Sequence, residues 1–424
     1  MICYYYPPLA DVGGKRSVAF SVYFAKYGWN PHVLSVKNPD KSYCQLGNER
    51  PPDGIDVTYS YSVVNVYKFF SLAHGVLIRA LKPFRFEPKR NYFYDVFCVP
   101  DIFFGWIPHA VMVGFKIMSK NDIDLIYVSC SPWSSAIVGV MLKEMTGKRL
   151  VIDYRDPYAI DIPTRNKNMY PFEFRKRIDR RIEDFVLRKT DLVILNTEET
   201  RKLYIEQYPH IRKKAFTVHN GFEAKYLPKG KRHKKFEKFT VIYTGQFYFY
   251  ASEGDVFFKA IGKLKQANEI DRDGFQFLFY GDGGKKIQQL SRKYDVEDLV
   301  KVSKRIPYED LLNTLQRSHL QLLRIVKPAI STKLFEGTTL NVPFLATIPS
   351  GEVQDIINRY SPSSYIINDD SHEKVAEAIL DAREKYKNNH IKDNHVKEFL
   401  NNFSRESLTK ELMQLVDSQL MSAN

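Results

Sequence analysis

The sequence has little cysteine, no long apolar run and no recognisable leader segment. Its cysteines are widely spaced and include no C-x-x-C pair, so neither a zinc site nor a disulfide framework is indicated; they are Cys3, Cys44, Cys98 and Cys130. No run of about 18 uncharged apolar residues predicts a membrane-spanning helix. The first residues lack the basic region and small-residue cleavage site of a signal peptide. We therefore expect a reducing, cytoplasmic location.

Acidic residues are outnumbered by basic ones, which gives a formal net charge of +14 and a pI of about 9.3. Such a balance indicates a polyanionic neighbour: nucleic acid, anionic lipid or a phosphorylated substrate. The basic residues gather in several clusters, at residues 175–181, 212–214 and 229–238. The sequence contains no RNP-type motif, zinc-finger spacing or basic zipper region, so nucleic acid is the least favoured of the three.

The 424 residues, 44% of them hydrophobic, are enough for two well-buried domains. Apolar runs of strand and helix length alternate along the chain, which predicts α/β domains with parallel sheets covered by helices on both faces. The predicted strands are residues 1–6, 32–36, 124–129, 150–154, 191–196, 216–222, 239–244, 275–280, 300–302 and 320–325. The predicted helices include residues 66–84, 172–188, 256–266, 285–294, 308–316, 374–387 and 405–421. The helix at 172–188 is expected to keep its Glu and Arg residues mostly in solvent.

The stretch at residues 329–346 reads as a polar turn, a helix and a buried strand. A helix that opens at Ser331 or Thr332 is capped by a hydroxyl. Its free N–H groups, with Lys333 beside them, suit a phosphate, and we expect Lys333 to be exposed. Glu336 follows one turn later, where a carboxylate could reach the hydroxyls of an attached ribose. An ordinary capped helix has the same spacing, so the pattern alone leaves both interpretations open.

Glycines follow several predicted strands directly. Gly13 and Gly14 lie between the first strand and an amphipathic helix, an arrangement that lets backbone N–H groups approach a phosphate. The pair lacks the G-x-G-x-x-G pattern, and a plain turn explains it as well. Gly245 and Gly281 each end a later strand, where a small residue permits phosphate or base to come close.

A charged pair, Arg155 and Asp156, follows the predicted strand at 150–154. In doubly wound sheets ligands bind outside the carboxyl ends of the strands, so both residues are candidates for function. The alternative is a surface ion pair before the turn at Pro157. His219, near the end of the first half, is interpreted as structural.

Three of these segments resemble the family-4-like glycosyltransferases of the GT-B fold. Ser331 to Glu336 is similar to their Ser-Lys-Leu-Phe-Glu signature. The order Tyr-Pro-Pro, then Gly-Gly, resembles their first strand and loop. The run from Ser131-Pro132 to Asp156-Pro157 resembles one branch of the family. The resemblance covers nearly the whole chain.

The resemblance implies two facing Rossmann-like domains with a nucleotide-sugar cleft between them. Residues 1–222 would form the acceptor-binding domain and residues 223–395 the nucleotide-sugar-binding domain, with a helix in residues 396–424 packing back towards the first. It also implies a retaining, metal-independent hexosyltransferase that uses a nucleoside-diphosphate sugar of the UDP or GDP type, with no resident cofactor. In the family the Glu at the position of Glu336 holds the ribose, and the helix start at Ser331 and Thr332 faces the diphosphate.

The chain departs from the family at two places. Pro328 occupies the position where many members carry a second Glu that touches the donor sugar. Gly245 is followed by Gln246, Phe247 and Tyr248, where the family has Gly-Arg and a later Lys. We expect Arg324 and Lys333 to neutralise the diphosphate instead, with the N–H groups near Gly14 and Thr332, and Arg155 and Asp156 to lie on the acceptor side.

Two other functions remain open. A nucleotide-sugar epimerase shares the fold but needs placed carboxylate and His groups for proton transfer, and no such cluster is evident in the sequence. A basic nucleic-acid-binding module is the third interpretation.

The predicted helix at residues 66–84 has apolar residues at helical spacing, which would ordinarily lie in the core. Its C-terminal flank, however, mixes basic and aromatic residues: Arg85, Phe86, Lys89, Arg90, Tyr92, Phe93 and Tyr94. That composition is typical of an interfacial segment. We therefore expect a peripheral protein at the inner face of the membrane. Its acceptor would be lipid-linked or a polysaccharide, as in bacterial surface polysaccharide synthesis.

Overall fold

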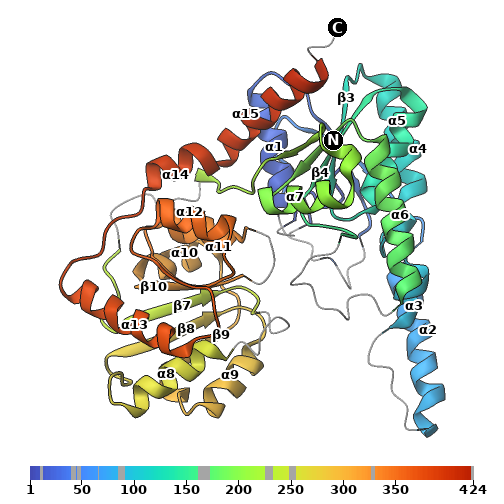
Figure 1. The fold of residues 1–424 in the computed structure, drawn as a ribbon. Coiled ribbons are helices and arrows are strands. Elements are labelled where there is room, and N and C mark those ends of the chain that lie inside the picture. The colour runs from blue at the N-terminus through green and yellow to red at the C-terminus, as the bar shows by residue number, and fades with distance from the viewer. Residues whose placement is uncertain are drawn as a thin grey trace. The chain divides into compact units, whose positions relative to one another are not determined.

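The computed structural model describes residues 1–9, 13–39, 44, 49–64, 66–84, 91–160, 172–224, 233–247, 255–325 and 330–421. The chain divides into two compact units (Figure 1). Unit 1 comprises Met1–Ile162, Lys167–Asn220 and Arg405–Asn424, and unit 2 comprises Pro163–Asn166 and Gly221–Ser404. Each unit contains its own parallel sheet.

In unit 1 the strands are β1 (His32–Val36), β2 (Asp56–Ser60), β3 (Leu125–Cys130), β4 (Arg149–Tyr154), β5 (Leu192–Leu195) and β6 (Ala215–Thr217). β2 pairs with β1, and β3 to β6 follow one another, all in parallel. The predicted strand at 1–6 is wrong as a regular strand: only Ile2 forms bridges, to Leu34 on one side and Val128 on the other. This short segment nevertheless joins the two groups of strands, so the whole sheet is parallel.

Helices cover both faces of the unit 1 sheet because strand side chains alternate between the faces. Tyr127, Val151 and Ile194 pack with α1 (Gly14–Lys26) and α15 (Arg405–Val416). Ile126, Ile152 and their alternating neighbours pack on the other face, beneath α4 (Ile107–Lys120), α5 (Ser134–Thr146) and α6 (Glu173–Lys189). The two layers are visible in Figure 1. Further helices in the described part of this unit are α2 (Val66–Leu81), its 3-10 extension η1 (Lys82–Phe84), α3 (Tyr92–Phe97) and α7 (Glu198–Gln207), besides three short ones, η2 (Phe104–Trp106), η4 (Pro209–Ile211) and η7 (Asp417–Met421).

The expectation that the polar residues of α6 are solvated is wrong for one face of the helix. Arg175, Asp179 and Glu183, spaced four residues apart, are all less than a tenth exposed. Glu183 accepts hydrogen bonds from the hydroxyls of Tyr204 at 2.6 Å and Tyr208 at 3.0 Å. Asp179 accepts from Arg175 Nε and from the Tyr158 hydroxyl, each at 2.8 Å. Because every charge finds a partner, this charged face can be buried.

In unit 2 the strands are β7 (Phe239–Thr244), β8 (Phe275–Tyr280), β9 (Val300–Ser303), β10 (Leu320–Arg324), β11 (Phe344–Thr347) and β12 (Tyr365–Ile367). Their order in the sheet is β12-β11-β10-β7-β8-β9, and every pair is parallel. This is the doubly wound order of a dinucleotide-binding fold, which reverses direction between β7 and β10.

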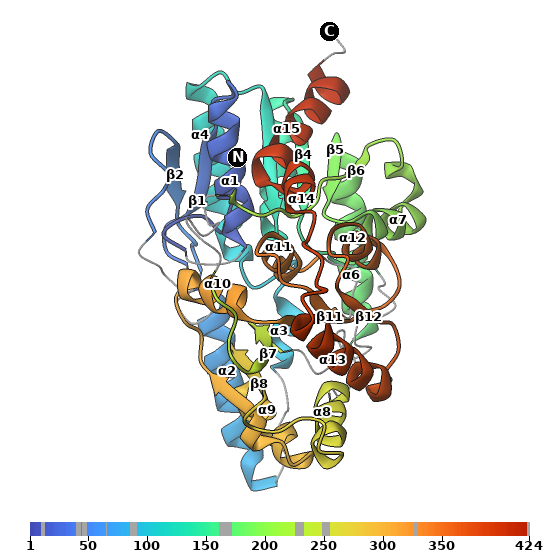
Figure 2. The same cartoon turned by 90° about the vertical axis from the view of Figure 1, so that its left-hand side faces the viewer.

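The helices of unit 2 also form two layers. One contains α8 (Val256–Gln266), α9 (Gly284–Lys293) and α13 (His372–Lys387), whose apolar residues share a core with Val241, Phe277 and Leu322. The other contains α10 (Tyr308–Arg317), α11 (Thr332–Thr339), α12 (Glu352–Tyr360) and α14 (Val396–Phe403). Figure 2 shows the same elements from the side. The strands and helices predicted at 239–325 are confirmed to within two residues, whereas α3, α12 and α14 were not foreseen.

The two segments that connect the units run side by side. Phe222 N donates to Phe403 O at 2.9 Å, and Phe222 bridges Ser404 in parallel. The chain thus leaves unit 1 after Asn220 and re-enters it at Arg405 next to its own exit.

A buried ion pair fixes that exit on the unit 1 side. Arg16 of α1 donates to Asp153 of β4 through Nε at 2.7 Å and Nη2 at 3.1 Å. The same guanidinium donates to the carbonyls of Val218 and His219, and Tyr127 donates its hydroxyl to Asp153. Burial lowers the pKa of Arg16, but the Asp153 carboxylate and Tyr127 raise it above its ordinary value. The Arg16 guanidinium therefore joins α1 and β4 to Val218 and His219, the residues just before the chain leaves unit 1.

We expect Asp153→Asn to destabilise the protein by about 3–5 kcal/mol, because it leaves the Arg16 charge buried without its counter-ion. Urea denaturation followed by circular dichroism measures the loss. The matched control is Asp184→Asn, which removes a partly exposed pair with Arg188 at 2.8 Å and should cost less than about 1 kcal/mol. Equal losses in the two variants would contradict a central role for Arg16.

Candidate functional site

The reversal of strand order in unit 2 separates the loops that follow β7 and β10. β7 ends at Thr244 and continues into Gly245, while β10 ends at Arg324. Neighbouring parallel strands deliver their carboxyl ends to one edge of the sheet, and at a reversal point the following loops diverge and leave room for a ligand. This edge collects most of the predicted site residues of unit 2.

At this edge of the sheet, two glycines let the backbones of neighbouring loops approach each other unusually closely. Gly245 has φ +87°, and its N–H donates to Tyr280 O at 2.7 Å. A Cβ on Gly281, which has φ +156°, would lie 1.9 Å from Gly245 O. A side chain at Gly281 would force the Gly245 backbone to move, and the positive φ of Gly245 disfavours a side chain there, so the loops after β7 and β8 touch through bare backbone.

The helix predicted at Ser331 or Thr332 is confirmed as α11. Ser331 is its N-cap, and Ser331 Oγ accepts a hydrogen bond from Lys333 N at 3.4 Å. Thr332 is the first helical residue and is exposed. Leu334 N donates to Ser331 O at 3.0 Å, so Ser331 organises the N–H groups at the start of this helix.

Lys333 is not the exposed side chain that the sequence suggested. Lys333 is only partly exposed, and its Nζ lies 4.8 Å from the centre of the Tyr243 ring. Lys333 Cε and Nζ both lie 3.7 Å from where a Cβ on Gly245 would be. Burial lowers the pKa of Lys333, although Glu336 acts in the opposite direction. The ammonium is thus held against the glycine edge in surroundings that favour arrival of a negative charge.

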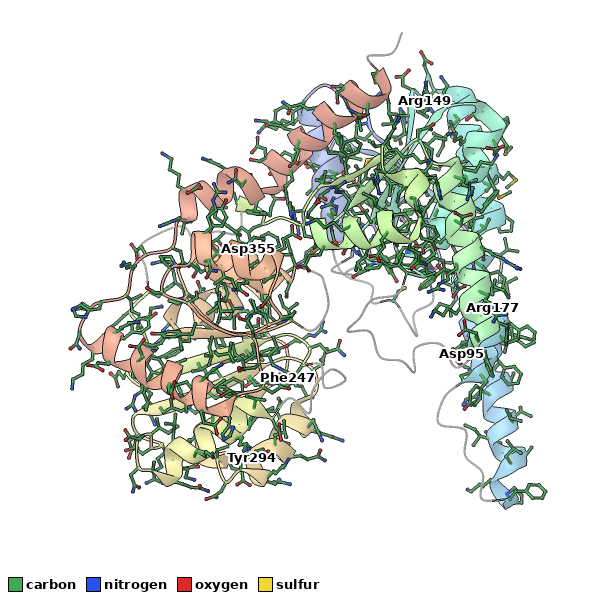
Figure 3. The ribbon with its side chains drawn as sticks, in the orientation of Figure 1. Asp95, Arg149, Arg177, Phe247, Tyr294 and Asp355 are labelled. Atoms are coloured by element: carbon green, nitrogen blue, oxygen red, sulfur yellow. The ribbon has the colours of Figure 1, made fainter. Side chains whose placement is uncertain are left out.

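Arg324 supplies a second cation at the same edge. Its guanidinium carbon lies 4.6 Å from the centre of the Phe247 ring, which Figure 3 labels. Burial lowers the pKa of Arg324 from its ordinary value. The structure therefore brings Gly245, Gly281, Lys333 and Arg324 together.

Glu336 is only 7% exposed, one turn into α11. Its Oε1 accepts a hydrogen bond from the Tyr308 hydroxyl at 3.0 Å. Tyr308 opens α10 directly after Pro307, and the sequence reasoning did not single it out. In the sequence, Tyr308 is only a polar aromatic residue at the start of a predicted helix, and this pattern is too common to indicate a functional residue.

In unit 1 the structure brings Gly13, Gly14 and Arg155 together. A Cβ on Gly13 would lie 2.0 Å from Arg155 Nη1, so the guanidinium covers the glycine at the start of α1. Arg155 Nη2 donates weakly to Ser131 Oγ at 3.5 Å, and Nη1 is buried with no hydrogen-bond partner in the described part of the chain. Asp156 lies 3.8 Å from Arg155 Nε and is 44% exposed. This set places an Arg and an Asp side by side at the carboxyl end of β4, next to the start of α1.

Some predictions lie beyond these two sets. Pro328, Tyr248 and the basic residues at 85–90 fall outside the described residues. Within the described residues, no group of three or more His, Cys, Asp or Glu side chains is placed to hold a metal ion.

Two protein-family models match the chain, one in each half. A family model described as "Glycosyltransferase Family 4" matches residues 20–226, and one described as "Glycosyl transferases group 1" matches residues 229–398. No curated protein sequence matches the chain.

Solved structures are similar over nearly the whole chain. Sucrose-phosphate synthase from Thermosynechococcus elongatus is 16% identical with a TM-score of 0.67, covering 100% of this chain and 98% of that one. Anabaena HepE in complex with UDP-glucose is 11% identical with a TM-score of 0.61, covering 96% of each. A putative UDP-N-acetylglucosamine 2-epimerase from Listeria monocytogenes is 12% identical with a TM-score of 0.52, covering 96% and 94%. At these identities the likeness shows a shared fold.

We expect Gly281→Ala to cost about 1–3 kcal/mol of stability, because the new methyl group must push the Gly245 backbone away. Gly75→Ala is the control: it lies in α2, nothing is within 4 Å of the added Cβ, and alanine suits a helix. Urea denaturation of both variants tests the difference. A Gly281 variant as stable as the Gly75 variant would show that the two loops are not in contact.

Proposed function

The chain belongs to the family-4-like glycosyltransferases of the GT-B fold. We propose that it transfers a sugar from a nucleoside-diphosphate sugar to an acceptor with retention of configuration. The carrying observation is the edge of unit 2, where Lys333 and Arg324 lie beside bare backbone at Gly245. Two cations, a helix start and a buried carboxylate match the diphosphate and ribose of such a donor. The donor is of the UDP or GDP type.

In this proposal the protein acts mainly through electrostatics. Transfer breaks the bond between the anomeric carbon and a diphosphate oxygen, and negative charge grows on the departing diphosphate. Lys333 and Arg324, with the N–H groups at the start of α11, stabilise that charge without having to reorganise. The acceptor oxygen attacks from the same face, and its proton passes to the leaving phosphate. No metal ion is required for these steps.

Glu336 is proposed to hold the ribose. A carboxylate accepts hydrogen bonds from two vicinal hydroxyls, and its burial makes those bonds stronger than they would be in water. Tyr308, which donates to Oε1 at 3.0 Å, fixes the orientation of the carboxylate in which we propose that it meets the ribose.

Unit 1 is proposed to bind the acceptor, with Arg155, Asp156 and the Gly13-Gly14 helix start as its polar groups. The acceptor we propose is lipid-linked or a polysaccharide, in bacterial surface polysaccharide synthesis at the cytoplasmic face of a membrane. The excess of basic residues supports an anionic surface as a neighbour.

The second candidate is a nucleotide-sugar epimerase, because the putative epimerase from Listeria monocytogenes has the same fold. Incubation with candidate nucleotide sugars separates the functions. A transferase slowly hydrolyses its donor without acceptor, an epimerase returns an isomer, and a nucleic-acid-binding module does neither. A thermal-shift panel of UDP, GDP, ADP and TDP then identifies the base.

For the ribose contact we expect Glu336→Gln to weaken nucleoside-diphosphate binding by about 1.5–3 kcal/mol, since a charge-assisted hydrogen bond is lost. Calorimetric titration with the ribonucleotide and its 2′-deoxy analogue sharpens the test. The native protein should prefer the ribonucleotide, and the variant should lose most of that preference, with Tyr308→Phe in between. Unchanged discrimination in a folded Glu336 variant would remove this residue from the site.

For the diphosphate contact we expect Lys333→Met to slow donor hydrolysis by roughly 10²–10³-fold, as for removal of one charge-stabilising donor. The melting temperature without ligand should not fall, because burial already opposes the Lys333 charge and Met keeps the apolar stem. Lys285→Met, an exposed change on α9, is the control. A variant that melts early but turns over normally would make Lys333 structural.

A further inference from the structure

An exposed apolar face on α2 stands out on unit 1. Phe69, Leu72 and Val76, here called the apolar stripe, are 62%, 65% and 65% exposed. Successive residues of an α-helix advance by about 100°, so these three lie within an arc of about 60°. Large apolar side chains gathered in this way on a protein surface mark a binding face rather than a random exposure.

Basic residues border the stripe on one side. Lys68, Arg79 and Lys82, here called the basic edge, fall within a second arc of about 60° beside the first. All three are exposed. Residues 66–84 contain no Asp or Glu, so the face carries only positive charge. From the apolar stripe and the basic edge together we propose that α2 docks this protein on an anionic lipid surface.

The face is held in place from behind. Phe70 turns inward and stacks on Phe93 and Phe97 of α3, with ring centres 6.0 and 5.6 Å apart, and Phe70 O accepts a hydrogen bond from Asn91 Nδ2 at 3.0 Å. The buried Arg175 of α6 then donates to Asp95 O of α3 at 3.0 Å.

Figure 3 labels Asp95 at this junction, together with Arg177 of α6. Arg175 is in turn anchored by Asp179 at 2.8 Å. A continuous chain of contacts thus connects α2 with the main body of unit 1. The stripe therefore has a defined orientation on that unit.

The geometry fits a helix that lies in the interface. No helix in the described parts of the chain is long and apolar enough to cross a membrane. A helix with aromatic and aliphatic residues on one face and Lys and Arg at its border binds along the boundary of headgroups and acyl chains. The basic edge attracts anionic headgroups, while the stripe enters the apolar layer.

A second copy of the chain fits this face less well. A symmetric dimer through α2 would use the same patch on both partners. It would then bring two basic edges close to each other without any acidic residue of 66–84 between them. An anionic bilayer satisfies both the apolar and the charged part of the face. The inference rests on the proposed transfer to a lipid-linked acceptor, which requires the enzyme to reach a membrane.

Vesicle flotation of the full chain tests the proposal. We expect binding to phosphatidylcholine vesicles that contain phosphatidylglycerol, no binding to phosphatidylcholine alone, and weakening by salt. The stripe variant Phe69→Ser, Leu72→Ser, Val76→Ser should lose more than roughly tenfold in affinity. The edge variant Lys68→Gln, Arg79→Gln should lose roughly fivefold for each charge.

Two control variants remove residues of the same kind, apolar or basic, elsewhere on unit 1. Met141→Ser, Met145→Ser removes exposed apolar residues of α5, which are 42% and 51% exposed, and should leave flotation unchanged. Arg212→Gln, Lys213→Gln removes two exposed charges at another place on unit 1 and should weaken flotation far less than the edge variant.

Donor hydrolysis is measured on the same samples. Native protein that hydrolyses a nucleotide sugar but stays in the soluble fraction at low salt overturns the docking proposal and leaves the transferase intact. Equal losses in the stripe variant and its α5 control also overturn it. A dimer in analytical ultracentrifugation that only the stripe variant dissociates, without vesicle binding, would assign the face to a second copy.

Discussion

Parallel pairing is the constraint on which both units depend. A sheet whose strands all run in one direction must bring every carboxyl end to the same edge, so the loops that follow are crowded there. Side chains cannot fill such an edge if a ligand is to use the backbone. Gly281 meets this demand directly, since it lies against Gly245 with no room for a methyl group. The cations then come from the strand end at Arg324 and from the next helix at Lys333.

Buried charge has a positioning role in unit 1. Arg16 holds Asp153 and the carbonyls of Val218 and His219, so the last residues before the connection to unit 2 are tied to α1. Arg175 does the same for α3. Neither cation is free to face solvent, and each replaces several separate contacts by one forked donor. Burying these groups is tolerable only because each finds carboxylate or carbonyl partners.

The sequence was informative where periodicity and local chemistry agree, as in β7, α8 and the Ser331 cap. It failed where long-range partners decide. Residues 1–6 form no regular strand, although Ile2 lies between β1 and β3. The burial of Glu183 depends on the hydroxyls of Tyr204 and Tyr208, and that of Arg175 depends on the carbonyl of Asp95, partners that no local pattern reveals. For α2, periodicity predicted an apolar face but could not show that Phe69, Leu72 and Val76 are exposed. In the candidate site, Gly245, Gly281 and Arg324 were predicted from their places at strand ends. The contacts of Tyr308 with Glu336 and of the Tyr243 ring with Lys333 are seen only in the folded structure.

The path of α15 affects the order in which the protein can mature during synthesis. Leu408, Leu412 and Val416 complete the core that α1 forms with β4 and β5, yet the ribosome makes them after all of unit 2. Domains usually fold as they emerge, the N-terminal one first. Here the first unit must wait with one apolar face uncovered while the second emerges and folds. Until α15 has been made, the nascent chain therefore exposes the apolar residues of α1, β4 and β5 that α15 later covers.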